Sequence, residues 1–274
     1  MEVRRLTAAI GAEINGVDLA RDLAPETVRE IRAAWLAHCV VFFRDQELSA
    51  AQFLAFAQTL GAPVEYPFIK GLPGFPCITP VVKLEHERHN FGGIWHSDTT
   101  YLDSPPMGTL LLAREVPPAG GDTLFANQYL AYETLSAGLQ QVLAGLVGVA
   151  SSAKADVTKT REDRLKTDGR ADAQKEFSAE HPVVRTHPET GRKALYVNIG
   201  HTARFKGWTD AESAPLLNFL FQHQIQAEFT CRFTWRPGSI ALWDNRCAQH
   251  YPVNDYHGHR RVMHRITLAG DRPQ

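Results

Sequence analysis

The stretch Trp95-His96-Ser97-Asp98 places an imidazole and a carboxylate two residues apart. In an extended strand, side chains at positions i and i+2 point to the same face, so His96 and Asp98 would converge on one point. On a helix the same pair would diverge by about 200°, because a helix has 3.6 residues per turn. One further imidazole would complete the two-histidine, one-carboxylate face that non-haem Fe(II) oxygenases use. So short a motif also occurs by chance, and the rest of the chain has to supply the third ligand.

The composition of the chain limits the kinds of protein that it can be. Of 274 residues, 44% are hydrophobic and 22% are charged, which is enough to bury a sizeable core. The formal net charge is -1, so no overall electrostatic footprint indicates a nucleic acid or a membrane as a partner. Four scattered cysteines without CxxC spacing indicate buried free thiols in a reducing cytoplasm. We expect no signal peptide, and no apolar run reaches the ~20 residues that span a bilayer.

The N-terminal part of the chain predicts alternating strands and helices. Residues 10–19 predict a short strand and a turn, and residues 25–38 have the apolar spacing of a helix with proline in its first turn. The apolar run 39–43 predicts a buried strand. Residues 49–61 begin with a capping-box sequence and predict a second helix that ends at a glycine.

The middle of the chain combines a long loop with further elements. Residues 63–93 are rich in proline and glycine, so we expect a functional loop with a short strand near 78–82. Strands are predicted at 107–114 and 123–126, separated by a strong turn signal. The pattern of residues 128–149 predicts a helix.

The segment 151–180 is polar and densely charged, and we expect a mobile lid there. A solvated loop or a partly mobile helix would have the same composition. A helix capped by Thr209, with Glu212 as its capping-box partner, then interrupts a series of strands. These strands are predicted at 182–186, 194–198, 229–236, 239–244 and 261–268. Short strands that do not alternate regularly with helices favour an α+β sandwich or barrel over a doubly wound parallel sheet.

Twelve histidines compete to be the third metal ligand. Most have a structural explanation, since they end a helix, lie in a charged loop or sit in a turn. His250 differs, because the strand-like Trp243-Asp-Asn-Arg246 leads into it and another predicted strand, with Arg261, follows it. His264 is its rival, but its odd offset from Arg261 and Arg265 places it on the opposite face of that strand.

Arg261 and Arg265 share one face of the last predicted strand, with Cα atoms roughly 13 Å apart at about 3.3 Å per residue. Like charges on a buried strand are costly unless anions meet them. The two guanidiniums could therefore hold two different anions by bidentate hydrogen bonds. Alternatively, both arginines form structural salt bridges with the protein's own carboxylates.

A set of motifs resembles the TauD/TfdA family of Fe(II)- and 2-oxoglutarate-dependent dioxygenases, which include the taurine dioxygenases. The motifs, in order, are Trp95-His96-Ser97-Asp98, Gly120-Gly-Asp-Thr123, His181-Pro-Val-Val-Arg-Thr-His-Pro188, Trp243-Asp-Asn-Arg246, His250 and Arg260-Arg-Val-Met-His-Arg265. The likeness is colinear from about Ile10 to Asp271 and implies a single domain over residues 1–274. It also implies a double-stranded β-helix (jelly-roll) core with flanking helices, and a family that commonly forms homo-oligomers.

The resemblance assigns roles to particular residues. It implies that the catalytic iron ligands are His96, Asp98 and His250. By the same resemblance, Thr123 and Arg261 bind the distal carboxylate of 2-oxoglutarate. Arg265 matches the position that, in taurine-type members, meets the acidic group of the substrate.

The implied activity is that of an EC 1.14.11 dioxygenase, with Fe(II) as cofactor and 2-oxoglutarate and O2 as cosubstrates. Such an enzyme converts 2-oxoglutarate to succinate and CO2 and hydroxylates a second substrate. Related halogenases lack the metal-binding carboxylate, so the presence of Asp98 favours hydroxylation. Arg265 favours a small anionic substrate, namely a sulfonate, a sulfate ester or a carboxylate.

Four positions, aligned with the substrate pocket of the taurine-type members, distinguish this chain. Tyr66, Ile69 and Gly92 stand where those members carry His, Tyr and Asn, and Ser152 replaces an aromatic residue. These changes favour an anion other than taurine. Three alternatives stay open: a taurine dioxygenase that releases sulfite and aminoacetaldehyde, a zinc hydrolase with the same three ligands, and an inactive anion-binding member.

Overall fold

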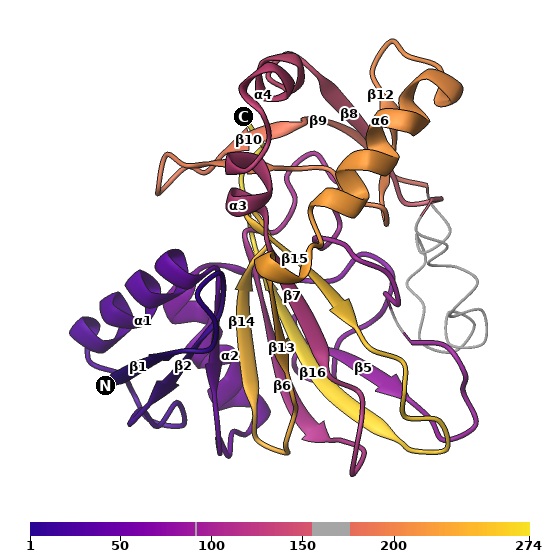
Figure 1. Ribbon diagram of the computed structural model, residues 1–274. Helices are drawn as coiled ribbons and strands as arrows, with labels where there is room; N and C mark the ends of the chain where they lie inside the picture. Colours follow the sequence, from indigo (N-terminus) through magenta and orange to yellow (C-terminus); the bar gives the residue numbers. More distant parts are fainter. Residues whose placement is uncertain (91, 155–175) are drawn as a thin grey trace.

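The computed structural model describes residues 1–90, 92–154 and 176–274 (Figure 1). Most of the predicted lid, residues 155–175, lies outside the described residues. The helices are α1 Pro25–His38, α2 Ala50–Leu60, α3 Gln128–Glu133, α4 Ala137–Leu143 and α6 Asp210–His223. The strands of the two core sheets are β1 Glu2–Arg5, β2 Ala12–Asn15, β3 Val40–Phe43, β4 Pro63–Val64, β5 Thr79–Lys83, β6 Gly108–Glu115, β7 Thr123–Asn127, β13 Thr230–Phe233, β14 Ile240–Asp244, β15 Ala248–Pro252 and β16 Arg261–Leu268. The other strands are β8 Val147–Ser151, β9 Ser178–Pro182, β10 Val184–Thr186, β11 Lys193–Leu195 and β12 Thr202–Phe205.

The larger core sheet has the order β1-β2-β3-β14-β6-β16-β4, and β5 also pairs with β16. Its central strand β6 is antiparallel to both neighbours, so that Leu110 lies opposite Leu242 of β14 and Ile266 of β16. Alternate residues of β6 point to opposite faces. Leu110 packs into the cluster beneath the helices, whereas Leu111 packs into the cluster between the two core sheets. The sheet is therefore buried on both faces, which explains the apolar run from Leu110 to Ala113 in β6.

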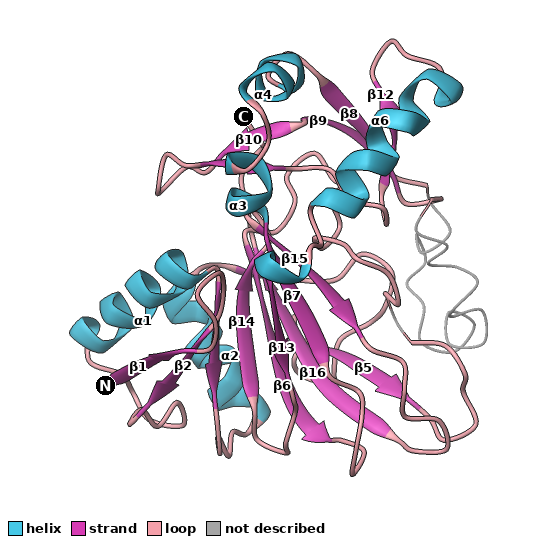
Figure 2. Ribbon diagram, viewed as in Figure 1, coloured by secondary structure: helices cyan, strands magenta, loops and turns pink. Residues whose placement is uncertain are grey.

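Helices α1 and α2 cover the outer face of the larger sheet (Figure 2). Ile31 and Trp35 of α1 and Phe53 of α2 are fully buried there. Burying one such aliphatic or phenylalanine side chain stabilises the fold by roughly 1.5–3 kcal/mol. Both helices confirm the sequence prediction, and Ser49 and Gln52 form the expected capping box of α2.

The smaller core sheet has the order β13-β7-β15 and faces the inner side of the larger sheet. Phe125 of β7 and Phe233 of β13 pack on Phe42 of β3, with ring centroids 5.5 Å and 4.0 Å apart. Two sheets, antiparallel except for the parallel pair β2–β3, enclose one apolar core and form the jelly roll, so the predicted fold class is confirmed. The remaining elements, from α3 to α6, gather at one end of the sheets in Figure 1.

Some predicted elements were wrong. The helix expected over 128–149 ends at Glu133, restarts after the cap of Ser136, and gives way to strand β8. β8 pairs with β9 and β12, and this long-range pairing outweighs the local helical pattern. Strands β1, β4, β9, β12 and β15 were not predicted. The segment expected to be a lid has strand at both ends, because Ser151 lies opposite Ser178.

All four cysteines are free thiols, as predicted, although Cys77 is half-buried rather than buried. Among the described residues, none of the helices has both the length and the apolar character needed to span a bilayer.

Candidate active site

His96, Asp98 and His250 meet at one point. One ligand atom from each lies within 4.8 Å of the other two, and all three residues are buried. His96 is held by a single antiparallel bridge to His250, in which each backbone N–H donates to the other's carbonyl at 3.1 and 2.9 Å. Asp98 lies in the turn that follows, so the two side chains converge without the extended strand from which their convergence was argued.

The His96 ring is fixed by contacts on two sides. Its Nδ1 lies 2.7 Å from the Ile94 carbonyl and donates to it, because a carbonyl can only accept. The lone pair of Nε2 is therefore left for a metal, and Nε2 lies 3.7 Å from Asp98 Oδ1. A Cβ at Gly92 would lie 2.8 Å from Cε1 of His96, so a side chain at this position would collide with the ring.

The three candidate ligands favour their metal-binding protonation states. Burial lowers the pKa of His96, and burial together with the nearby His96 lowers the pKa of His250 to about 3. Burial by itself would raise the pKa of Asp98. The neighbouring His250, the positive charge of Arg265, the neighbouring His96 and a hydrogen bond from Thr109 together outweigh burial and lower that pKa to about 2. Two neutral imidazoles and one carboxylate suit a divalent metal and leave it a net charge of about +1.

Arg261 and Thr123 both lie close to Trp235. The Trp235 indole donates to Thr123 Oγ1 at 2.9 Å, and Cζ of Arg261 lies 5.7 Å from the Trp235 ring centroid. Arg261 is buried, and its Nε and Nη2 have no hydrogen-bond partner among the described residues. A buried guanidinium with open donors is costly unless an anion meets it. The 2-oxoglutarate carboxylate predicted at this position fits that requirement.

Lys83 was missed by the sequence analysis. It lies directly opposite Arg261 across the β5–β16 ladder, so both side chains start from the same face. Lys83 is buried, its Nζ lies 4.0 Å from the Tyr256 ring centroid, and it has no hydrogen-bond partner within the part of the chain that is described. Burial lowers the pKa of Lys83. Two buried cations thus face the same region of the core.

Arg265 occupies the other end of the same face of β16. Its Nη1 lies 3.6 Å from Asp98 Oδ1, and its Cζ lies 4.4 Å from the Tyr66 ring centroid. The structural salt bridge considered from the sequence is thus partly realised, with a carboxylate of the candidate metal site as partner. His264 points the other way, as predicted, and its Nδ1 accepts a hydrogen bond from Arg114 at 3.2 Å.

Three of the predicted pocket residues gather on one aromatic wall. Tyr66 and Ile69 belong to a buried cluster with Phe68 and Tyr101, and Phe177 packs against it. Ser152 Oγ accepts a hydrogen bond from the backbone N–H of Phe177 at 2.9 Å. An aromatic side chain is therefore present beside Ser152, but it comes from a part of the chain that the sequence alignment did not indicate.

His201 is a second residue that the sequence did not single out. Its ring centroid lies 5.7 Å from that of His96 and 4.9 Å from that of Tyr101. Burial and the nearby His96 lower its pKa to about 3, so it is a neutral imidazole at pH 7. Its Nδ1 lies 2.9 Å from Thr100 Oγ1, which fixes the ring at the edge of the aromatic wall.

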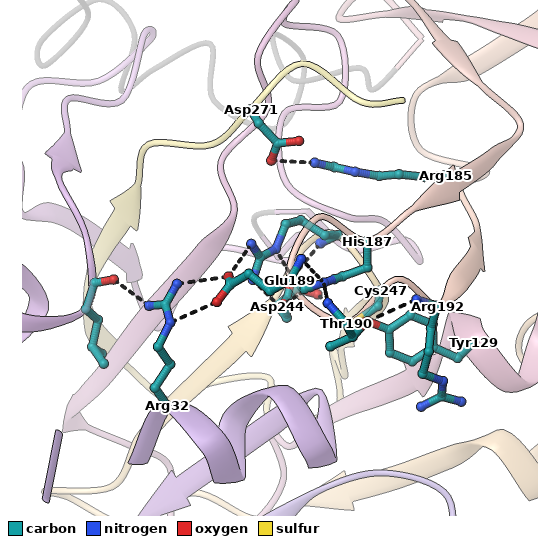
Figure 3. Close-up of polar contacts among 12 residues, drawn as sticks. Arg32, Tyr129, Arg185, His187, Glu189, Thr190, Arg192, Asp244, Cys247 and Asp271 are labelled. Atoms are coloured by element: carbon teal, nitrogen blue, oxygen red, sulfur yellow. Dashed lines mark hydrogen bonds and ion pairs between the residues drawn. The ribbon is translucent and has the colours of Figure 1, made fainter. Parts of the chain in front are cut away.

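A second cluster with metal-ligand residue types contains His187, Asp244 and Cys247 (Figure 3). Its carboxylate is fully engaged, because Asp244 accepts from the Arg246 backbone, from two Arg246 side-chain nitrogens and from His187 Nε2, at 2.7–3.0 Å. His187 Nδ1 accepts from the Glu189 and Thr190 backbones, each at 3.2 Å. Burial raises the pKa of the Cys247 thiol well above its usual value. No lone pair of the imidazole or carboxylate is left for a metal.

Comparison with known proteins gives consistent matches. A family model described as "Taurine catabolism dioxygenase TauD, TfdA family" matches residues 2–267. An alkylsulfatase of Acinetobacter baylyi is 38% identical, over 99% of this chain and 86% of the relative. An alpha-ketoglutarate-dependent sulfate ester dioxygenase of Pseudomonas putida is 36% identical, over 100% of this chain and 91% of the relative. The solved structure of a taurine dioxygenase from Burkholderia xenovorans has a TM-score of 0.84 at 37% identity, covering 99% of this chain and 90% of that one.

Proposed function

The chain belongs to the TauD, TfdA family and is a 2-oxoglutarate-dependent non-haem iron dioxygenase that acts on a small anionic substrate; we propose that this substrate is an alkyl sulfate ester. Its cofactor is Fe(II), and 2-oxoglutarate and O2 are its cosubstrates. The observation that carries the substrate proposal is the position of Arg265, between Asp98 and an apolar aromatic wall. A sulfate group would meet the guanidinium while the alkyl chain lies on the wall. The names of the two curated relatives support the same class.

We propose that His96, Asp98 and His250 hold the iron. When bound, Fe(II) supplies the activation of O2 that couples the decarboxylation of 2-oxoglutarate to substrate hydroxylation. The protein holds three ligands on one side, which leaves the other coordination positions for the cosubstrates. The buried surroundings keep both imidazoles neutral and exclude bulk water.

We propose that Arg261 and Thr123 bind the distal carboxylate of 2-oxoglutarate. The open Nε and Nη2 of Arg261 can donate to both carboxylate oxygens, and the Thr123 hydroxyl is oriented by the indole of Trp235. Lys83 adds a second positive charge beside Arg261 and would further favour a dianionic cosubstrate.

Hydroxylation at the carbon that bears the ester oxygen would cleave the substrate without a hydrolytic nucleophile. One oxygen atom of O2 enters this C–H bond and the other enters succinate. The resulting hydroxy sulfate ester then loses its C–O bond to sulfate, and the products are an aldehyde and hydrogen sulfate. Tyr66, Ile69 and Ser152 would line the path of the alkyl chain, and Gly92 would leave room beside His96.

A substrate panel tests the proposal. Hexyl sulfate, hexanesulfonate, hexanoate and taurine are compared by succinate release and O2 consumption, and we expect hexyl sulfate to give the highest kcat/KM. A best rate with taurine would establish the taurine alternative instead. Sulfate release that needs neither O2 nor 2-oxoglutarate would indicate the zinc hydrolase. Failure of every compound to stimulate succinate release would favour the inactive member.

Arg265→Met sharpens this test. Loss of the guanidinium is expected to raise the KM for hexyl sulfate by roughly 30-fold or more, because a charged bidentate contact is worth about 2–5 kcal/mol. Slow succinate formation without substrate should persist. Arg272→Met, at an exposed arginine, serves as the matched control and should behave like the wild type. An unchanged KM in Arg265→Met would refute the anion assignment.

We further propose that the enzyme works in the cytoplasm as a homo-oligomer of one-domain chains, with neither nucleic acid nor membrane as a partner. The net charge of -1 and the free thiols support these proposals. Light scattering on the purified protein tests the oligomeric state, and a monomer at micromolar concentration would contradict it.

A further inference from the structure

The turn between β14 and β15 places the side-chain amide of Asn245 against Asp98. Asn245 Oδ1 lies 3.1 Å from the backbone nitrogen of Asp98 and 3.0 Å from the indole nitrogen of Trp243. Both nitrogens can only donate, so the atom between them has to be the amide oxygen. The orientation of the Asn245 amide is therefore fixed by its surroundings.

This orientation determines what Thr109 can do. With Oδ1 engaged, the Nδ2 of Asn245 faces Thr109 and donates to its Oγ1 at 2.9 Å. Thr109 Oγ1 also lies 2.6 Å from Asp98 Oδ2. Because Nδ2 already donates to this hydroxyl, its single hydrogen is directed to the carboxylate, and the chain of donors runs one way from Trp243 to Asp98. Thr109 and Asn245 are fully buried, so no bulk water competes.

We propose that Thr109 and Asn245 are positioning residues for the metal-binding carboxylate of Asp98, an inference that rests on the proposed metal site. Thr109 engages Oδ2, and Oδ1 is the oxygen that faces His96 Nε2 at 3.7 Å and Arg265 Nη1 at 3.6 Å. The carboxylate can then offer the metal one oxygen in a fixed direction. A carboxylate free to rotate could offer both oxygens and occupy a position that the 2-oxo acid or O2 needs.

The neighbouring ion pair explains why Asn245 is held in place. Asp244 and Arg246 flank it and bind one another through two side-chain hydrogen bonds at 2.8 and 2.7 Å. Arg246 also donates to Glu189, which in turn binds Arg32 of α1 at 2.9 Å (Figure 3). The turn is thereby connected to Glu189 and to helix α1. The cluster that contains Asp244 thus stabilises Asn245, which in turn orients Asp98.

Two pairs of variants isolate the Thr109 hydroxyl. Valine differs from threonine by this hydroxyl, and alanine differs from serine by the same group. The dissociation constant for Mn(II), a redox-inert stand-in for Fe(II), is measured by calorimetry on the full chain, together with the melting temperature of the metal-free protein. We expect Thr109→Val and Thr109→Ala to bind Mn(II) 10- to 100-fold more weakly. Thr109→Ser should stay within about threefold of the wild type, because serine can donate to the same oxygen.

Two further variants complete the design. Thr267 lies directly opposite Thr109 on β16, and Thr267→Val is the matched control, expected to leave Mn(II) binding unchanged. Asn245→Ala should weaken binding in the same direction, and adding it to Thr109→Ala should cost less than the sum of the two.

The possible outcomes distinguish a failure of the positioning role from a failure of the proposed metal site. If the wild type binds Mn(II) and both hydroxyl-deleted variants bind it equally well, the positioning role is wrong while the metal site stands. If Thr109→Val does not fold, the serine and alanine pair decides alone. If the wild type does not bind Mn(II), the proposed metal site fails and the positioning role fails with it.

Discussion

The two buried clusters that contain histidine and aspartate both consist of metal-ligand residue types, but their properties are opposite. In the cluster of His96, Asp98 and His250, ring nitrogens and a carboxylate oxygen face one another, with His96 Nε2 3.7 Å from Asp98 Oδ1. In the cluster of His187, Asp244 and Cys247, the carboxylate accepts four N–H groups and both imidazole nitrogens are engaged. Residue type and proximity therefore do not make a metal site, which also needs lone pairs that the protein has left unused.

The two clusters also differ in how their charges are balanced. The negative charges of Asp244 and Glu189 are matched by Arg246 and Arg32, so adding a cation would break buried ion pairs. Around Asp98 the imidazoles are neutral, and the single guanidinium of Arg265 lies 3.6 Å away. The cluster around Asp98 can therefore accept a divalent cation, whereas the cluster around Asp244 cannot.

The largest effect is expected from removing a ligand of the open cluster. His96→Ala, Asp98→Ala and His250→Ala should each abolish turnover and tight Mn(II) binding, because two remaining ligands rarely hold such a metal. Calorimetry measures binding, and circular dichroism checks that each variant remains folded. Retained stoichiometric binding with unchanged affinity in any of the three would contradict the assignment.

Breaking the closed cluster should affect stability instead. Asp244→Ala removes the buried anion that His187 and two side-chain nitrogens of Arg246 contact, and we expect a loss of about 3–5 kcal/mol in the free energy of unfolding. Urea denaturation of the metal-free protein measures this loss. The wild type should bind one equivalent of Mn(II), and a second tight equivalent that disappears in Asp244→Ala would show that this cluster also binds metal.

Arg261→Ala is expected to have a smaller and more selective effect. The variant should need a higher 2-oxoglutarate concentration, corresponding to about 2–5 kcal/mol of lost binding energy, with little change in the KM for the primary substrate. Titration of the metal-loaded protein with 2-oxoglutarate, in the absence of O2, measures the dissociation constant. Arg236→Ala, at an exposed arginine on the loop after β13, is the control. Equal affinities in both variants would exclude Arg261 from the cosubstrate site.

The last prediction concerns pH. His201 and His250 have pKa values of about 3 in the folded, metal-free protein, below the ordinary 6.5. Between pH 3 and pH 6.5 the unfolded chain therefore binds more protons than the folded chain. The contribution of these two histidines to the free energy of unfolding is therefore fully present above pH 6.5. It falls as the pH decreases toward 3, on the order of 1 kcal/mol per pH unit for each histidine. Urea denaturation at pH 7.5 and 5.0 measures this, and saturating Mn(II) should reduce the loss because metal competes with protons for His250. Greater stability at pH 5.0 would contradict the prediction.

Much of the fold was predictable because its signals are local. Helices α1 and α2 follow from apolar spacing and a capping box, and strand β16 was predicted with the bounds that the structure has. The shared face of Arg261 and Arg265 follows from strand geometry alone. The helix predicted over 128–149 failed in its second half because β8 is stabilised by pairing with β9 and β12, which no local pattern reveals.

The sequence by itself determined which residue types the chain offers: an imidazole and a carboxylate in one short motif, two arginines on one strand face, and motifs that resemble one family. Only the tertiary structure decided which of these groups remain available for binding. Asp98 and Asp244 are both aspartates beside histidines, but one faces ligand atoms and the other is surrounded by donors. Lys83, Thr109 and Asn245 acquired their places through contacts between distant segments. The physical reason is that a side chain's hydrogen bonds and charge balance depend on neighbours that the chain brings together only when it folds.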